Sequence, residues 1–125
     1  MAPPAERCYN AFISPVRHKL RSHGDRRKTW IVLNVTYQCR PGMRDAFLKA
    51  IAAEGIDAAS RAEDGNIRYD YYLPAAGGDE LFLLEKWRDA AALSAHAAQP
   101  HYAGLKDLKA EYVADTAIER FEVPD

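Results

Sequence analysis

Residues 80–102 change their hydrophobic period halfway along, and this change constrains the fold more than any other feature of the sequence. The run 81–84 is unbroken and apolar, which is typical of a strand that is covered on both faces. Glu85 and Trp87 continue that strand and share one of its faces, because alternate side chains point the same way. Asp89 then offers a carboxylate to the free N–H groups of a new helix. The sequence therefore predicts a central strand followed at once by a helix that packs against it.

That helix is expected over residues 90–98, where Leu93 and His96 fall on one side at helical spacing. Pro100 ends it, and His101 and Tyr102 open another short helical segment. The strand is therefore expected to place Glu85 in the interior, and the helix is expected to place His96 there.

The other predicted elements follow from their periodicity. They are strands over 30–39, 67–73 and 116–123, a long helix over 43–61 and an amphipathic helix over 101–113. The order β-α-β-β-α-β predicts a ferredoxin-like α+β fold, with a four-stranded antiparallel sheet and helices on one face. Because the other face is then bare and partly apolar, we expect it to pair with a second copy in a homodimer.

Two predicted strands carry polar side chains that matter for the site. In strand 30–39, Asn34 shares a face with Val32 and Thr36, opposite the face of Ile31, Leu33, Val35 and Tyr37. An Asn within a strand usually either forms hydrogen bonds with nearby groups of the protein or binds a ligand. In strand 67–73, Ile67, Tyr69 and Tyr71 face one way, and Arg68, Asp70 and Tyr72 face the other.

Length and composition limit the organisation. A chain of 125 residues with 48% hydrophobic residues fits one domain, expected over 29–125. Residues 1–28 carry seven basic against two acidic residues and are expected to form a flexible extension, with a transit peptide or polyanion-binding arm as the alternatives. The remainder carries ten basic against sixteen acidic residues, which argues against nucleic acid as a partner.

The cysteines and the apolar runs bear on the compartment. Cys8 and Cys39 have no spacing typical of a zinc site or a disulfide framework, so a reducing cytoplasm is expected. No apolar run reaches the roughly 18 residues of a membrane span, and no membrane partner is expected.

From residue 30 to 123 the chain resembles the antibiotic biosynthesis monooxygenase family. The resemblance is carried by Asn34, by Glu-Asp-Gly-Asn at 63–66, by Glu-Lys-Trp at 85–87, and by Ser-Ala-His at 94–96 with Gln-Pro-His-Tyr at 99–102. It implies a dimeric α+β barrel. The nearest likeness is to small quinol monooxygenases, which oxidise phenols or quinols with O₂ and without metal or flavin.

Two other branches of that fold are relevant. One isomerises or degrades a small phosphorylated dione signal and has a similar helix. The haem-degrading branch uses a strand Asn with a Trp and an iron-binding His, but here His96 and Lys106 stand at those two positions, which disfavours haem.

The resemblance implies a small aromatic substrate and O₂, and a site built from three polar residues. His96 is the expected base, because an imidazole titrates near neutrality. Asn34 would donate to the anion, provided that both residues face one hollow between sheet and helices. Glu85 would orient His96, act as the base itself, or form an ion pair with the other subunit. The aromatic and polar residues expected to bind substrate are Trp87, Tyr69, Tyr71, His101 and Tyr102. For His96 and Trp87 the alternative is an ordinary core position, and for His101 it is an exposed one.

No metal site is predicted, because His96 and His101 are five residues apart, the wrong offset for one helix face. The resemblance implies that no other cofactor is needed. Two further functions stay open. A dione isomerase would need a cation in the pocket, from Arg68, Lys86, Arg88 or Arg120. A non-catalytic dimeric ligand-binding or scaffold module gains ground if the space between sheet and helices is filled by Phe47, Ile51, Leu93 and Leu105, which would leave no cavity of about 300 Å³.

Overall fold

A computed structural model describes residues 29–124 of the chain. The described elements are β1 (Thr29–Cys39), α2 (Arg44–Ala53), α3 (Ile56–Arg61), β2 (Asn66–Tyr72), β3 (Glu80–Trp87), α4 (Ala90–Ala97), α5 (Pro100–Tyr112) and β4 (Val113–Pro124). The predicted extension over 1–28 lies outside the described residues.

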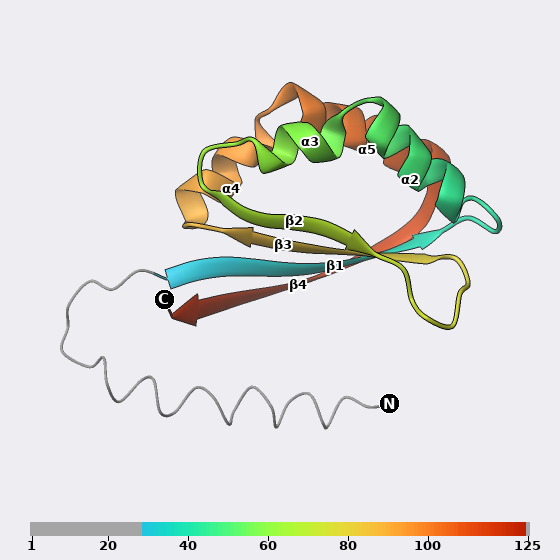
Figure 1. The fold of residues 1–125 in the computed structure, drawn as a ribbon, viewed down its shortest axis with the longest axis horizontal. Coiled ribbons are helices and arrows are strands. Elements are labelled where there is room, and N and C mark those ends of the chain that lie inside the picture. The colour runs from blue at the N-terminus through green and yellow to red at the C-terminus, as the bar shows by residue number, and fades with distance from the viewer. Residues whose placement is uncertain (1–28, 125) are drawn as a thin grey trace. The chain divides into compact units, whose positions relative to one another are not determined.

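The four strands form one sheet in the order β2-β3-β1-β4. β3 pairs antiparallel with both β1 and β2, and Leu83 stands opposite Val35 on one side and Tyr71 on the other. All four described helices lie on the same side of this sheet (Figure 1). The ferredoxin-like α+β prediction is therefore confirmed.

The core lies between the helices and one face of the sheet. Alternate residues of β1 and β3 are buried there, as period-2 patterning requires. Phe47 of α2 has no exposed surface and packs edge-on against Tyr37 of β1, with ring centroids 5.4 Å apart. The apolar core comprises Ile31, Leu33, Val35, Tyr37, Cys39, Phe47, Ile51, Ile56, Tyr69, Leu81, Leu83, Trp87, Ala92, Leu105, Leu108 and Val113.

The helical layer differs from the prediction at one glycine. A single helix was predicted over 43–61, but the structure has α2 and α3 separated at Gly55, whose φ of 69° is left-handed. Glycine adopts this conformation without the steric cost of a Cβ atom, so the chain can restart at a new angle. The predicted cap of α4 is confirmed, since the Asp89 carboxylate accepts a hydrogen bond of 2.9 Å from the Ala92 N–H.

Two strands also differ in detail. β2 contains an irregularity between Asn66 and Arg68, which leaves Ile67 47% exposed rather than on the face of Tyr69. β4 begins at Val113, directly after α5 and three residues earlier than predicted.

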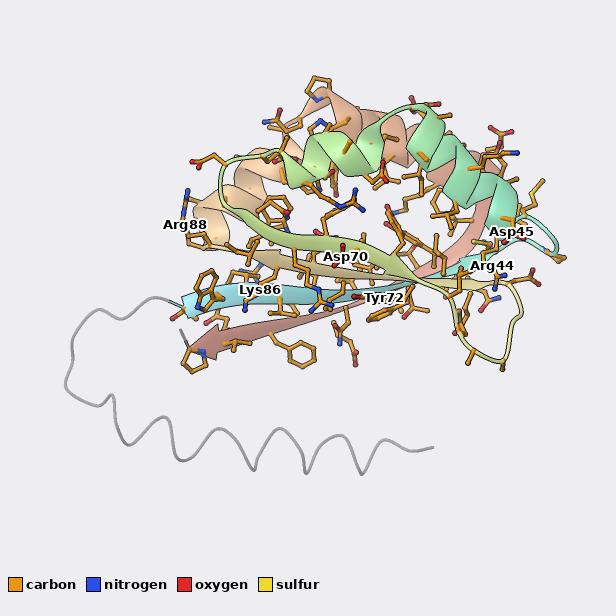
Figure 2. The ribbon with its side chains drawn as sticks, in the orientation of Figure 1. Arg44, Asp45, Asp70, Tyr72, Lys86 and Arg88 are labelled. Carbon is orange, nitrogen blue, oxygen red and sulfur yellow. The ribbon has the colours of Figure 1, made fainter. Side chains whose placement is uncertain are left out.

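The other face of the sheet, which we call the open face, is covered by no helix of residues 29–124 (Figure 1). It carries the half-buried Val32 and Asn34 of β1 and Phe82 and Leu84 of β3. Lys86 and Tyr72 are also on the strands, away from the helices (Figure 2), and the Lys86 ammonium sits 4.8 Å from the Trp30 ring centroid. In this part of the chain no helix has the length and apolar character needed to cross a membrane.

Candidate functional site

Three side chains from different segments meet at Glu63, in the turn after α3. The Nδ1 atom of His96, on α4, lies 2.6 Å from Oε2 of Glu63. The Nε2 atom of His101, in the first turn of α5, lies 2.6 Å from the same oxygen. His96 is 3% exposed, and the side chains of Glu63 and His101 are 10% and 16% exposed. We call these three residues the Glu63 cluster.

Two local features of the backbone bring the Glu63 cluster together. α4 ends at Ala97 and α5 starts at Pro100, so the chain changes direction between the two histidines. The turn that carries Glu63 contains Gly65 at φ 94°, and a Cβ atom there would lie 2.6 Å from Cβ of Ala92. Only glycine lets this turn approach α4 so closely, and the approach places Glu63 over His96.

The hydrogen bonds of the Glu63 cluster fix the ring tautomers. An ionised carboxylate only accepts hydrogen bonds, so each imidazole must donate an N–H to it. Nδ1 of His96 and Nε2 of His101 therefore carry hydrogen, and a neutral ring keeps a lone pair on its opposite nitrogen. A carboxylate paired with imidazoles in this way can take part in general acid–base catalysis.

Aromatic rings surround His96. The Trp87 ring lies 4.6 Å from it between centroids, the Tyr102 ring 5.2 Å and the Tyr69 ring 5.8 Å. These rings keep water from most of the imidazole and hold its plane. Of the predicted substrate-binding residues, Trp87, Tyr69, His101 and Tyr102 are thus gathered around His96.

Glu85 lies near this group but has a different partner. It is 6% exposed, and its Oε1 accepts a hydrogen bond of 2.9 Å from the Trp87 indole N–H. Burial is the largest cause that raises the pKa of the Glu85 carboxyl above its ordinary value. Among residues 29–124 it is Glu63, and not Glu85, that hydrogen-bonds to His96.

Tyr69 and Tyr71 point to the helix side of β2, next to Glu85 and Leu83 of β3. Their rings pack edge-on with centroids 5.8 Å apart. Within the described part of the chain, neither hydroxyl has a hydrogen-bond partner, although both are buried. Burial raises the pKa of Tyr69 to about 12 and that of Tyr71 further, so both phenols are protonated donors.

Asn34 is not part of this site. It pairs with Leu84 and belongs to the open face, whereas the side chains facing the helices from β1 are its neighbours Leu33 and Val35. Since His96 is on the helical side, the sheet separates the two residues. The prediction that Asn34 and His96 share one hollow is wrong, because alternation along β1 directs Asn34 away from the helices.

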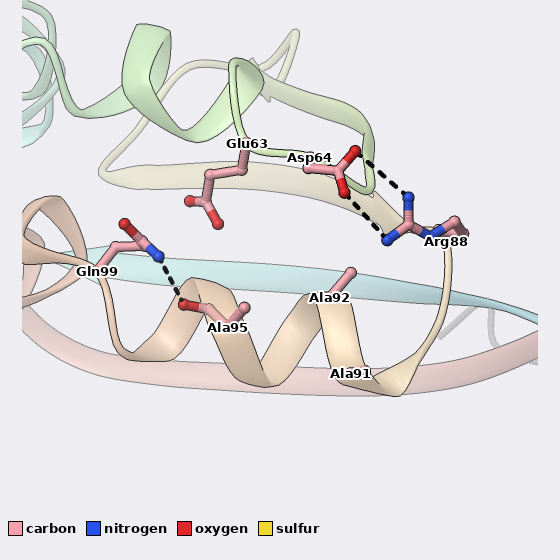
Figure 3. Close-up of a pocket in the computed structure, with 7 residues that line it drawn as sticks. All are labelled: Glu63, Asp64, Arg88, Ala91, Ala92, Ala95 and Gln99. Atoms are coloured by element: carbon pink, nitrogen blue, oxygen red, sulfur yellow. Dashed lines mark hydrogen bonds and ion pairs between the residues drawn. The ribbon is translucent and has the colours of Figure 1, made fainter.

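An open pocket of about 410 Å³ lies between the turn after α3 and helix α4 (Figure 3). Its lining residues are Glu63, Asp64, Arg88, Ala91, Ala92, Ala95 and Gln99. Arg88 pairs with Asp64 at 3.4 and 3.5 Å across one end (Figure 3). Glu63 belongs both to the pocket wall and to the Glu63 cluster, so it connects the pocket with the buried His96.

Glu63 was not predicted as a site residue, and the predicted lack of a shared role for the two histidines is wrong. The five-residue offset excludes a common face only on one continuous helix, and His96 and His101 lie on two. The predicted helix end at Pro100 was the signal that this offset did not apply. Glu63 stood in the motif at 63–66, which was used only to support the family resemblance.

Fold and comparisons together define the class, a small ferredoxin-like α+β protein. The family model described as antibiotic biosynthesis monooxygenase matches residues 30–107, and the chain belongs to this family.

Two curated relatives are similar over much of this region. The Bacillus subtilis (strain 168) protein named "Putative monooxygenase YcnE" is 35% identical over 75 residues, covering 60% of this chain and 77% of the relative. The Mycobacterium tuberculosis (strain ATCC 25618 / H37Rv) protein named "Putative monooxygenase Rv0793" is 44% identical over 63 residues. The match covers 50% of this chain and 59% of the relative.

Solved structures show the same fold. The structure of Rv0793 has a TM-score of 0.65 at 31% identity and covers 74% of this chain and 92% of its own. That of PA3566 from Pseudomonas aeruginosa has a TM-score of 0.69 at 26% identity, with coverages of 78% and 96%.

Proposed function

We propose that this protein is a monooxygenase that oxidises a quinol or polyphenol with O₂, without a bound cofactor, and that the Glu63 cluster is its base. The observation that carries the proposal is that Glu63 belongs to two features at once. It lines a pocket of about 410 Å³, and its Oε2 lies 2.6 Å from a ring nitrogen of His96 and of His101. A flat aromatic substrate in the pocket meets this carboxylate. The family and its monooxygenase-named relatives support the reaction class.

In the proposed reaction, the base takes a proton from a substrate hydroxyl. The resulting anion is electron-rich and passes one electron to O₂, and recombination of the two radicals forms a carbon–oxygen bond to the ring. The O–O bond of this peroxide then breaks with proton transfer, so one oxygen atom leaves as water and the other stays on a hydroxyquinone. The quinol supplies all four electrons, and no external reductant is needed.

The chain's own residues have separate roles in this proposal. Glu63 accepts the substrate proton at the pocket wall, because it is the only member of the Glu63 cluster that lines the pocket. His96 and His101 donate hydrogen bonds to the carboxylate and hold it in place. Trp87 and Tyr69 exclude water from His96, and Glu85 holds the Trp87 indole.

We also propose that the protein is a homodimer that forms through the open face. Half-buried apolar side chains at Val32, Phe82 and Leu84 lie there, on the face of the sheet that no helix of residues 29–124 covers. A face of this kind on an isolated sheet is usually buried by a partner. A reducing cytoplasm suits the free, buried thiol of Cys39.

Oxygen uptake by the purified full chain with reduced naphthoquinones tests the proposal. We expect uptake above the autoxidation background, and a loss of about 100-fold in Glu63→Gln, which keeps the shape but removes the charge. Glu111→Gln is the matched control, because Glu111 is an exposed carboxylate of α5 outside the pocket lining. No enzyme-dependent uptake would reject the function, and equal uptake by Glu63→Gln and wild type would reject the role of the Glu63 cluster as its base.

One observation favours a second candidate, the isomerisation of a small phosphorylated dione. Arg88 lines the pocket and could bind an anionic group if its pairing with Asp64 opened. Such an isomerase would turn over without consuming oxygen. Turnover of a phosphorylated dione under anaerobic conditions, lost in Arg88→Gln, would favour this candidate over the monooxygenase.

A further inference from the structure

We infer that Glu63, His96 and His101 form a binding site for a divalent transition metal ion such as Zn²⁺ or Co²⁺. One carboxylate oxygen and two imidazole nitrogens, one from each residue, all lie within 4.8 Å of one another. Two imidazoles with one carboxylate form a donor set that such ions bind in proteins.

The geometry needs only a small adjustment to hold an ion. Ligand atoms at about 2.1 Å from a tetrahedral ion are roughly 3.4 Å apart. Oε2 of Glu63 is now 2.6 Å from each ring nitrogen, so this oxygen must move about 0.8 Å away from each of them. Glu63 can supply this movement because its side chain comes from a turn rather than from a packed helix.

The position of Glu63 in the pocket wall also leaves room for an outside ligand. Three protein ligands leave the fourth tetrahedral position to water or a small molecule. The pocket of about 410 Å³ beside Glu63 gives a path by which an ion and that ligand can enter. A buried structural zinc site would instead have four protein ligands and no path to solvent.

Metal binding and the proposed base use the same atoms. An ion bound at Nδ1 of His96 moves the ring hydrogen to Nε2, and an ion bound at Nε2 of His101 moves it to Nδ1. Neither ring then keeps a lone pair, and the Glu63 carboxylate is occupied. This part of the inference rests on the proposed function: the ion should inhibit the oxidation by removing the base.

The test uses Co²⁺ with the untagged full chain, followed by its visible absorption and by equilibrium dialysis. We expect one Co²⁺ per chain, and at least about tenfold weaker binding in His101→Gln and in Glu63→Gln. The control is the double variant His18→Gln/His23→Gln, which removes the other two histidines of the chain and should bind Co²⁺ as wild type does. His101 is chosen over His96 because its side chain is 16% exposed, against 3% for His96, and replacing it disturbs the core less.

The inference is wrong if no Co²⁺ binds, if His101→Gln binds as tightly as wild type, or if the His18/His23 variant loses the ion instead. Far-UV circular dichroism of each variant shows whether a loss of binding reflects unfolding, and in that case Glu63→Gln decides the result. Absorption by bound Co²⁺ does not depend on turnover. Binding without oxygen uptake would therefore reject the proposed function and keep the metal site, and uptake that Co²⁺ does not inhibit would reject the shared use of the atoms.

Discussion

Replacing Gly65 by alanine should destabilise the protein and displace the Glu63 cluster. Gly65 has φ 94°, and its new Cβ atom would lie 2.6 Å from Cβ of Ala92, closer than Cβ atoms approach in proteins. The left-handed conformation costs about 1–2 kcal/mol for a residue with a side chain. The contact adds an overpacking cost of about 1–3 kcal/mol, because Ala92 is 5% exposed on a capped helix and cannot easily move. We expect a loss of about 2–5 kcal/mol in the free energy of unfolding.

Gly77→Ala separates the two costs. Gly77 has φ 84°, close to that of Gly65, but nothing lies within 4 Å of a Cβ atom there. Its variant should therefore show the conformational cost alone, about 1–2 kcal/mol. Urea unfolding followed by circular dichroism measures both values. If Gly65→Ala were no more destabilising than Gly77→Ala, the close approach of the turn to α4 would not hold in solution.

The same substitution connects stability with the site. The turn that contacts Ala92 also carries Glu63. If the turn moves away from Ala92 to relieve the clash, Glu63 must move relative to His96. Under conditions where Gly65→Ala remains folded, we expect weaker Co²⁺ binding and slower oxygen uptake, whereas Gly77→Ala should match wild type in both. Unchanged binding in a folded Gly65→Ala would show that Glu63 is positioned by other contacts.

Three more predictions concern the core, Glu85 and the open face. Phe47→Ala should lower the free energy of unfolding by about 3–5 kcal/mol in urea titrations, because Phe47 has no exposed surface, and a loss below about 1 kcal/mol would contradict its core position. Glu85 has a raised folded-state pKa, so its ionisation favours the unfolded state: stability is fully present below the unfolded pKa of about 4.3 and falls as pH rises through the folded value. Glu85→Gln should remove this fall. Urea unfolding should therefore show that the free energy of unfolding of the variant, relative to wild type, is higher at pH 8 than at pH 4. The same difference from wild type at both pH values would contradict the prediction. Leu84→Lys should shift the protein toward monomer in analytical ultracentrifugation, whereas the exposed helical control Ala52→Lys should not, and a monomeric wild type would reject the open-face dimer.

The two faces of β1 and of β3 could be separated from the sequence because each depends only on local alternation. The pattern placed Leu81, Leu83, Glu85 and Trp87 on one face, and all four are buried under the helices. It also placed Asn34 opposite Leu33 and Val35. Both faces of β1 carry apolar residues, so alternation alone did not say which face the helices cover, and the resemblance led to the incorrect choice for Asn34.

The site was harder to predict because its members come from the ends of elements. Glu63 is 33 residues from His96 along the chain, and no periodicity relates a turn to a helix. Helical spacing identified His96 as inward-facing, but it separated His101 from it, since i and i+5 point apart on a continuous helix. Breaks in regular structure at Gly65 and Pro100 bring Glu63, His96 and His101 together. A sequence pattern identifies such breaks as the ends of helices and strands, but it does not predict how the chain continues in space.

Both histidines donate to one oxygen, and this arrangement determines which substitution is most informative. His101→Gln leaves the hydrogen bond between Glu63 and His96 intact, so the variant should keep part of the oxygen uptake. Glu63→Gln keeps an oxygen that can still accept one ring hydrogen, but it removes the charge that allows two donors to converge at 2.6 Å. If the Glu63 cluster acts as one unit, Glu63→Gln should reduce oxygen uptake more than His101→Gln, and adding His101→Gln to it should cost little further. Losses that simply multiply in the double variant would mean that the two residues act independently, and that the shared oxygen is only a packing contact.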